Sequence, residues 1–475
     1  MDRRQFALGV STSALAGASS RAAFAQGTAE NSEARLAAYA SALTFEQLPP
    51  DVVEALKRLL IDTFACAYGA LGCEPAAIAE KTFRADLGGG PAVATLIGGH
   101  APISVEGAAL VNGVLVRYLD LNDIYAGEEP AHPSECVPTA IACCEEAGKS
   151  GRDLLTAMAV GYETQLALVD AMAWGTRGFH SLSAAGFVTP LIAGKAWGLT
   201  AAQMANAVGI SGPKQLTLLA INAGAISMMK AFGYPSGAMD GIFAARLAKN
   251  GFTGASGALE WFIANSTGKT KEFHLELSPG KFRLLNVGLK RFPLQFELQI
   301  VAEAGVEIKK TMKATPADIS EIVVETTQSA KEKTADPTRY APKTKETADH
   351  SLPVCLAMAL IDGDVTVKQF DTGRWKAPDV LALASKVRVD AVPNAPRGGG
   401  AMVRVTAGGE KIEKRIDIPD GDPRRPMAPE SLAGKFNQFA APLLGKGRAE
   451  AVLEACHNLD KLGKVSDLTK LLTAG

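Results

Sequence analysis

Hydrophobic residues recur three and four positions apart along most of the chain between Ser32 and about Leu285. The segments that show this spacing most clearly are 52–64, 154–172, 190–197 and 242–248. Such spacing places the apolar side chains on one face of a helix. Thr200 is a suitable N-cap for a helix that starts at Ala201, and Gly251 is a suitable helix end. The pattern therefore predicts a large helical domain.

The pattern changes after Pro293. Segments that follow have the Val-, Ile- and Thr-rich composition of strands, namely 322–326, 387–389 and 402–406. Ala407-Gly408-Gly409-Glu410 then predicts a tight turn into the strand 411–416, and so a β-hairpin. Helical spacing is present in 295–312 and resumes over 429–472.

At 475 residues the chain is too long for one hydrophobic core, so at least two domains are expected. We predict a mainly α fold. Residues 26–285 and 427–475 would form a large all-helical domain, and residues 286–426 would form a smaller inserted α+β domain.

The first 25 residues have the composition of an export signal. Arg3-Arg4 precedes a stretch rich in Ala, Leu, Ser and Gly, and Ala23-Phe24-Ala25 resembles a cleavage site. This combination predicts a twin-arginine signal over residues 1–25 and a periplasmic protein in a bacterium, or a cytoplasmic one if the signal is not used. No later segment reaches the roughly 18 uninterrupted apolar residues of a membrane span, so we expect no membrane contact in the mature form.

Composition excludes several classes of protein. Lys plus Arg number 49 and Asp plus Glu 50, which argues against a nucleic-acid binder, and 47% hydrophobic residues argue against disorder. The seven cysteines are not spaced as a disulfide framework, and most are expected to be small buried residues. There is no Cys-x-x-Cys pair and the six histidines are scattered, so no metal site is expected.

One stretch, 112–142, concentrates polar side chains between two apolar helices. Asp120, Asn122 and Asp123 lie at the end of the first helix, and His132-Pro133 precedes the second. A loop on rigid helices that carries carboxylates and an imidazole can do acid-base chemistry. Asp and Asn are also common caps, and a His before Pro is often an ordinary loop residue. The pattern alone leaves both interpretations open.

The order Asn112-Gly113, Leu119-Asp120-x-x-Asp123 and His132-Pro133-Ser134 resembles the MmgE/PrpD family, which includes 2-methylcitrate dehydratases, cis-aconitate decarboxylases and iminodisuccinate epimerases. Further stretches that continue the resemblance are Gly178-Phe179-His180-Ser181, Met228-Met229-Lys230-Ala231, Leu289-Lys290-Arg291-Phe292-Pro293 and Asp349-His350-Ser351-Leu352-Pro353. The resemblance implies that the α+β domain is a lid, that the protein is a homodimer, and that it needs no metal or organic cofactor.

The resemblance also implies a set of site residues. Catalytic roles fall on Asp120, His132, His180, Lys230 and Lys290, and substrate-binding roles on Asn112, Tyr340, Arg291 and His350. The two lysines would bind substrate carboxylates, and Asp120 with the two catalytic histidines would supply the base and the acid. Several of these residues also have a structural alternative: His180 and His350 as caps, Lys230 reaching solvent, and Lys290 with Arg291 as a solvated linker pair.

The expected function is that of a dehydratase acting on a small di- or tricarboxylate such as 2-methylcitrate or citrate. Decarboxylation of a cis-aconitate-type substrate and epimerisation of an iminodisuccinate-type substrate are alternatives on the same scaffold. A non-catalytic periplasmic carboxylate-binding protein is an alternative of another class. The family commonly has Asp-Phe-Asp-Asp-Thr where this chain has Asp120-Leu121-Asn122-Asp123-Ile124, and Ile124 cannot donate a hydrogen bond. This difference leaves the substrate open.

Overall fold

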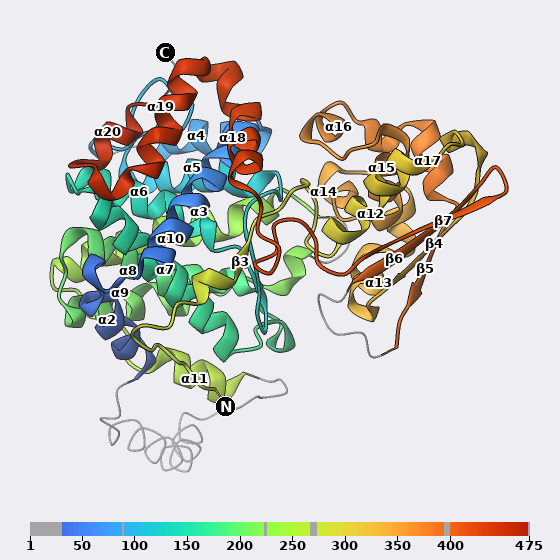
Figure 1. The fold of residues 1–475 in the computed structure, drawn as a ribbon. Coiled ribbons are helices and arrows are strands. Elements are labelled where there is room, and N and C mark those ends of the chain that lie inside the picture. The colour runs from blue at the N-terminus through green and yellow to red at the C-terminus, as the bar shows by residue number, and fades with distance from the viewer. Residues whose placement is uncertain (1–30, 88–89, 223–225, 267–272, 394–399, 474–475) are drawn as a thin grey trace, which may run out of the picture.

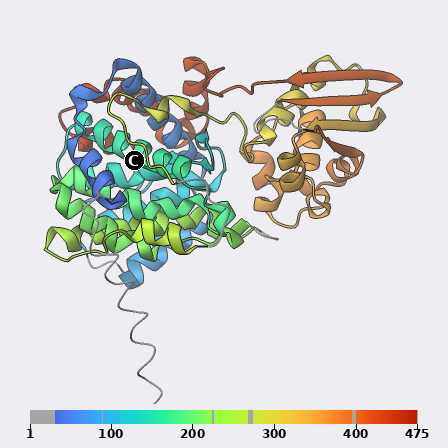
Figure 2. The ribbon, with the colours of Figure 1, turned by 90° about the horizontal axis from the view of Figure 1, so that it is seen from below.

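The computed structural model describes residues 31–87, 90–222, 226–266, 273–393 and 400–473. The export signal expected over residues 1–25 lies outside the described residues. The chain forms two neighbouring lobes (Figures 1 and 2). The larger lobe is helical, and the smaller lobe combines helices with a sheet. The predicted fold class, mainly α with a smaller α+β part, is confirmed.

The helices of the larger lobe come from both ends of the chain. They are α2 (Ser32–Ala42), α3 (Pro50–Gly69), α4 (Glu74–Thr82), α5 (Val105–Tyr118), α6 (Val137–Glu146), α7 (Gly151–Ala171), α8 (Ala185–Trp197), α9 (Ala201–Ser211), α10 (Met229–Lys249), α11 (Ala258–Asn265), α18 (Pro429–Leu444), α19 (Lys446–His457) and α20 (Val465–Thr469). Helix α10 packs against α5, α8 and α9, while α18 returns to pack against α3. Figure 1 shows the C-terminal helices in red beside the blue N-terminal ones.

Two helix ends follow the predicted signals. The Thr200 side chain accepts a hydrogen bond from the backbone N–H of Gln203 at the start of α9. Gly251, with a φ of +92°, follows the end of α10. A left-handed φ is accessible to glycine because it has no Cβ. Both boundaries are confirmed.

The smaller lobe, which we call the lid domain, is built on a four-stranded sheet with strand order β5-β4-β6-β7. Its strands are β4 (Ile319–Thr326), β5 (Val387–Ala391), β6 (Ala401–Ala407) and β7 (Glu410–Ile416). The β4–β5 pair is parallel, whereas β6 pairs with β4 and β7 antiparallel. Gly408 and Gly409 both have positive φ, at +56° and +84°, as the tight hairpin turn requires. The predicted hairpin is confirmed.

Helices of the lid domain pack against its sheet. They are α12 (Leu298–Thr311), α13 (Gln328–Thr334), α14 (Lys345–Ala348), α15 (Leu352–Asp362), α16 (Val367–Asp371) and α17 (Pro378–Ala384). Helix α12 packs on β6 and β7 and against α15. The buried hydrophobic residues form one cluster within 36–472, made almost wholly by the larger lobe, and a second within 292–416, made by the lid domain.

The larger lobe also contains a small sheet, so the prediction of an all-helical domain is incomplete. Strand β1 (Ile124–Ala126) pairs antiparallel with β2 (Pro130–Ala131) and with β3 (Val287–Gly288). These strands are too short to show a strand pattern in the sequence. The sheet holds the loop after Asp120 beside the segment that leads to Lys290.

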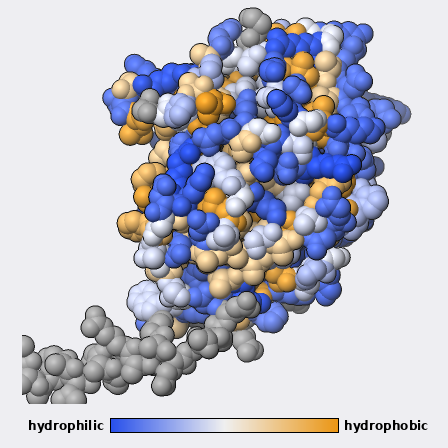
Figure 3. All heavy atoms as spheres, turned by 90° about the vertical axis from the view of Figure 1, so that its left-hand side faces the viewer, coloured by the Kyte–Doolittle hydropathy of each residue, from blue (hydrophilic) through white to orange (hydrophobic). Residues whose placement is uncertain are grey.

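The structure shows how hydrophobic side chains and cysteines are distributed over the molecule. On the face that Figure 3 shows, hydrophobic side chains lie in small groups among hydrophilic ones. Among the described residues no helix combines the length and the apolar character needed to cross a bilayer. All seven cysteines are described, and each is a buried free thiol. The homodimer stays a prediction.

Candidate active site

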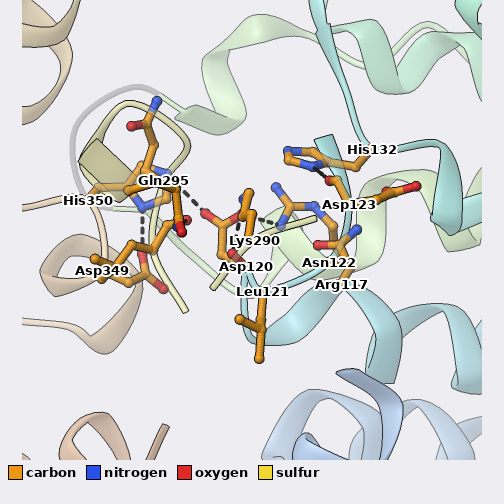
Figure 4. Close-up of polar contacts among 12 residues, drawn as sticks. Arg117, Asp120, Leu121, Asn122, Asp123, His132, Lys290, Gln295, Asp349 and His350 are labelled. Carbon is orange, nitrogen blue, oxygen red and sulfur yellow. Dashed lines mark hydrogen bonds and ion pairs between the residues drawn. The ribbon is translucent and has the colours of Figure 1, made fainter. Parts of the chain in front are cut away.

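Three cationic side chains converge on the carboxylate of Asp120, and Figure 4 labels two of them, Arg117 and Lys290. Arg117 Nη1 lies 2.8 Å and Lys290 Nζ 2.7 Å from Oδ1, and Lys230 Nζ lies 2.7 Å from Oδ2. All four side chains are buried. Arg117 is in the last turn of α5, Lys230 in the first turn of α10, and Lys290 follows β3. The structure therefore brings together three of the predicted catalytic residues.

The backbone of Asp120 is in an unusual conformation. Its φ of +52° makes it the one non-glycine residue with positive φ in the described part of the chain. The left-handed region costs roughly 1–2 kcal/mol for an L-residue, and Asp tolerates it better than most. The turn ends α5 and leaves the carboxylate among the three cations. Strain of this kind concentrates at functional sites.

The lid domain adds a second acid and a histidine. His350 Nε2 lies 3.7 Å from Asp120 Oδ2, and its Nδ1 lies 2.5 Å from Asp349 Oδ1 (Figure 4). Asp349 Oδ1 is also 3.6 Å from Lys230 Nζ. The helix that follows is capped by Ser351, whose side chain accepts from the N–H of Val354. The alternative that His350 caps this helix is therefore wrong.

Lys345 fastens the lid domain to the larger lobe at this point. Its Nζ pairs with Asp349 Oδ2 at 3.0 Å and donates to the carbonyl oxygen of Tyr118 at 2.9 Å. The ammonium also lies 4.4 Å from the centre of the Tyr118 ring. Because Tyr118 ends α5, the same helix end carries Asp120 and binds the lid.

His132 is a neutral imidazole that can accept a proton. Its Nδ1 lies 2.6 Å from the carbonyl oxygen of Asp123, so Nδ1 carries the hydrogen and Nε2 has a free lone pair. Burial, with Arg117 and Lys290 nearby, holds the pKa of His132 well below its usual value. In Figure 4 it lies on the opposite side of Asp120 and Lys290 from His350. The lowered pKa makes the ring a weak base in the free protein. A bound substrate carboxylate would raise that pKa, and the free Nε2 could then accept a proton.

His180 has the opposite tautomer. Its Nδ1 accepts a hydrogen bond from the N–H of Leu182 at 3.1 Å, so Nε2 carries the hydrogen. Burial, with Arg117 and Lys230 as neighbouring charges, lowers its pKa to about 4. The predicted capping role of His180 is thus present, because it is the N-cap of a 3-10 turn. The remaining Nε2–H is available as a donor.

Two further acids near this loop are buried, Asp123 held by hydrogen bonds and Glu135 by an ion pair. Asp123 accepts from Ser134 Oγ at 2.6 Å and Tyr162 Oη at 2.9 Å, and burial raises its pKa to about 7. Glu135 lies 3.1 Å from Arg117 Nε, and burial raises its pKa to about 8. Near neutral pH Glu135 is therefore mostly uncharged.

Positive charge is in excess around Asp120. Burial alone would raise the pKa of Asp120, but Lys230, Lys290 and Arg117 outweigh it and hold the pKa well below its usual value. One carboxylate thus faces three cations while Glu135 is mostly protonated, and Asp349 is shared with Lys345. A buried excess of positive charge attracts an anion strongly, because the surroundings screen charge poorly.

Three predicted substrate-binding residues, Asn112, Tyr340 and Arg291, lie outside this cluster. Asn112 accepts from the N–H of Ile97 at 3.0 Å and donates to the carbonyl oxygen of Thr95 at 2.9 Å. Tyr340 donates to the carbonyl oxygen of Val387 inside the lid domain. For both residues the bonds shown by the structure are internal to one lobe, so the geometry favours a structural role.

Arg291 lies on the other side of its segment from Lys290. Its guanidinium is 4.8 Å from the centre of the Phe292 ring. It lines a cavity of about 370 Å³ between the lobes, which we call the hinge pocket, together with Leu121, Thr366, Asp420 and Lys435. Arg291 therefore lies in the hinge pocket, whereas the side chain of Lys290 pairs with Asp120.

A substitution at Asn112 tests whether this residue has a structural role or a substrate-binding role. We expect Asn112→Ala to lower the free energy of unfolding by about 1–3 kcal/mol, because it leaves the buried N–H of Ile97 without an acceptor. The Michaelis constant should stay near the wild-type value. Urea unfolding and steady-state kinetics measure the two effects separately, and a raised Michaelis constant at unchanged stability would return Asn112 to the substrate site.

Sequence reasoning missed Arg117, Asp349 and Lys345. Arg117 stands three residues before Asp120, a spacing that brings side chains together on a helix. Asp349 lies in the Asp-His-Ser stretch that carries the resemblance, but only His350 was selected from it. Asn122, where the family commonly has Asp, donates to Ser134 Oγ, and Tyr125 donates to Asp170. Tyr125 therefore does not replace the hydroxyl that Ile124 lacks.

Three residues of the cluster could ligate a metal, but the lysines beside them disfavour a cation. Oxygen and nitrogen atoms of Asp120, Asp349 and His350 lie within 4.8 Å of one another. However, Lys230 Nζ contacts Asp120 at 2.7 Å and lies 3.4 Å from His350 Nδ1. Its ammonium, with that of Lys290, already neutralises Asp120 and would repel a cation.

The titrating groups predict a bell-shaped dependence of kcat/KM on pH. Burial next to Arg117 and Lys230 lowers the pKa of Lys290 to about 8, despite its pairing with Asp120. Activity that needs the Lys290 ammonium is lost as pH rises through about 8. As pH falls through about 4, His180 takes up a proton at Nδ1, which breaks its hydrogen bond from the N–H of Leu182 and is expected to lower activity. Initial rates across pH 3–10 (roughly the range these two limbs span) measure both limbs. In Lys290→Arg the upper limb should move to higher pH.

Comparisons with known proteins identify the family of the chain. Models of the MmgE/PrpD N-terminal and C-terminal domains match residues 34–274 and 292–461. Human cis-aconitate decarboxylase is 27% identical over 443 residues, which cover 89% of this chain and 90% of the relative. The Aspergillus terreus cis-aconitate decarboxylase is 25% identical, with 91% and 94% covered. The 2-methylcitrate dehydratase of Escherichia coli K12 is 24% identical, with 59% and 61% covered. The chain therefore belongs to the MmgE/PrpD family, whose matched relatives are dehydratases and decarboxylases.

Proposed function

We propose that this protein is a lyase that removes water from a small di- or tricarboxylate of the citrate type. The observation that carries the proposal is the buried convergence of Arg117, Lys230 and Lys290 on one acid, with two neutral histidines nearby. The cluster lies where the lid domain meets the larger lobe, because His350 and Lys345 reach it from the lid. A domain junction can close over a substrate and exclude water.

In the proposed reaction the lysines bind a substrate carboxylate. Neutralising that carboxylate stabilises the negative charge that develops when the neighbouring carbon loses its proton. His132 Nε2 accepts this proton, since its ring is neutral and its Nδ1–H is held by Asp123. The C–H bonding pair becomes the new double bond as the C–O bond breaks.

The departing hydroxide must receive a proton to leave as water. The ammonium of Lys290, with a pKa of about 8, is well matched to give it near neutral pH. The Nε2–H of His180 can donate a hydrogen bond to the same oxygen. After product release the proton on His132 returns to Lys290 through solvent, which restores both groups.

Decarboxylation is a second candidate, favoured by the coverage of the relatives. Cis-aconitate decarboxylases from human and Aspergillus terreus match this chain over about nine-tenths of their length, compared with 61% for the Escherichia coli dehydratase. Loss of carbon dioxide needs the same stabilisation of negative charge and one proton delivered to carbon. The cluster supplies both.

A panel experiment separates these reactions. The purified protein is incubated in D2O with citrate, 2-methylcitrate, cis-aconitate and aspartate-derived dicarboxylates, and the products are followed by NMR. Loss of water from citrate or 2-methylcitrate supports the dehydratase, and release of carbon dioxide supports the decarboxylase. Deuterium exchange without net loss of either indicates an epimerase. Thermal stabilisation by a panel member without conversion would overturn the enzyme assignment in favour of carboxylate binding.

A further inference from the structure

A second buried ion pair lies next to the cluster, and the proposed reaction does not use it. Lys435 in α18 has its Nζ 2.5 Å from Oδ1 of Asp62 in α3. The Asp62 side chain is fully buried, and that of Lys435 is 8% exposed. The pair links a helix near the C-terminus to one near the N-terminus, and both helices belong to the larger lobe.

The Lys435 ammonium also holds two backbone carbonyls that flank the candidate active site. It donates to the carbonyl oxygen of Leu121 at 3.0 Å and to that of Lys290 at 2.9 Å. An ammonium has three donors, so Asp62 and these two carbonyls use all of them. Leu121 directly follows Asp120, and Lys290 carries the ammonium that pairs with Asp120.

The two lysines clamp the strained turn at consecutive carbonyls. Lys290 Nζ donates to the carbonyl oxygen of Asp120 at 3.0 Å, and Lys435 Nζ donates to that of Leu121. The backbone of Asp120 is left-handed, with a φ of +52°, and such a conformation persists only where the surroundings hold it. Lys435 therefore holds both the turn that carries Asp120 and the backbone that carries its partner.

Charge is needed at this position for a specific reason. Burying an ion pair costs several kcal/mol per ion, and well-packed hydrophobic residues of similar volume are often as stable. A hydrophobic side chain could not donate to the two carbonyls, which would then stay unpaired. Asp62 compensates the charge of Lys435. The two other hydrogen bonds of Lys435 go to the carbonyl oxygens of Leu121 and Lys290.

We propose that Lys435, held by Asp62, is a positioning residue that fixes the distance between the Asp120 carboxylate and the Lys290 ammonium. It acts through the backbone and does not touch the substrate. This inference rests on the proposed function only in that Lys290 donates a proton in the reaction and Asp120 holds Lys290 in place. It also gives a role to the C-terminal helix α18, because α18 carries Lys435 and packs beside the site.

The test compares Lys435→Met with the double variant Asp62→Asn/Lys435→Met. The single variant leaves a buried carboxylate uncompensated, so it is expected to be destabilised and to lose activity. The double variant removes both charges and is expected to fold. Its Tm should fall by less than that of the single variant, because it leaves two unpaired carbonyls but no uncompensated carboxylate. We expect its kcat/KM to be lower by roughly 10- to 100-fold, because small displacements of catalytic groups are that costly. Lys446→Met, at an exposed lysine in α19, is the matched control and should be unchanged.

Hydrogen-deuterium exchange gives a readout that does not depend on turnover. Peptides covering 119–124 and 289–292 should exchange faster in the double variant than in the wild type or Lys446→Met, because the carbonyl clamp is gone. If the wild type converts no panel substrate, the proposed function fails while the exchange result still decides the positioning role. Unchanged exchange in both peptides, or wild-type kcat/KM in a folded double variant, would overturn the inference.

Discussion

Asp120→Asn is expected to reduce kcat/KM by about 1000-fold or more. Asparagine keeps the size of the side chain and tolerates the left-handed backbone, so the turn can form. It removes the charge that organises Arg117, Lys230 and Lys290, and three buried cations then lose their shared anion. Removing one preorganised electrostatic group typically costs about 100- to 1000-fold, and here it also disturbs the positions of three cations.

The same change should lower the free energy of unfolding by about 3–5 kcal/mol, the usual cost of removing one partner from a buried charge network. Glu163→Gln is the matched control. Glu163 is also a buried acid, but it accepts from the backbone N–H groups of Arg283 and Leu284, outside the cluster. The control should keep kcat/KM close to the wild-type value. Equal losses of activity in both variants would show that Asp120 has no special role.

Lys290→Met is expected to abolish most activity, by about 1000-fold, while the protein stays folded. Methionine fills a similar volume, but it cannot donate to the carboxylate or to the carbonyl oxygen of Asp120. The upper limb of the pH profile, set by the Lys290 pKa of about 8, should disappear from the residual activity.

The neighbouring Arg291→Met is the matched control for this variant. Arg291 carries the same charge one residue later but lies in the hinge pocket and over the Phe292 ring. We expect it to keep most of the activity. If the two variants lost activity to the same extent, charge in this segment would matter in general, and the assigned role of Lys290 would be wrong.

Local patterns predicted the features that depend on neighbouring residues. The Thr200 cap, the Gly408-Gly409 turn and the strands of the lid domain each follow from side chains within a few positions, and the structure has them all. The meeting of Asp120, Lys230 and Lys290 could not be worked out in this way. Their convergence was expected only because the resemblance implied it.

Features that depend on distant pairing escaped prediction. The contact between β1 and β3 joins segments far apart in the sequence, and neither is long enough to show alternation. The resemblance implied a substrate-binding role for Asn112, a residue of the helix that leads to Asp120, but its amide meets the loop at Thr95 and Ile97. A helix face turns by about 100° per residue, so nearness in sequence did not place Asn112 on the side of the site.

A crystal structure with propane-1,2,3-tricarboxylate bound tests the central claim most directly. This compound has the three carboxylates of citrate but no hydroxyl to lose, so it should bind without reacting. We predict one of its carboxylates within hydrogen-bonding distance of Lys230 Nζ and Lys290 Nζ, with His132 and His350 on either side and the lid domain above. The compound bound instead in the hinge pocket beside Arg291, with the Asp120 cluster unchanged, would contradict the assignment of this cluster as the active site.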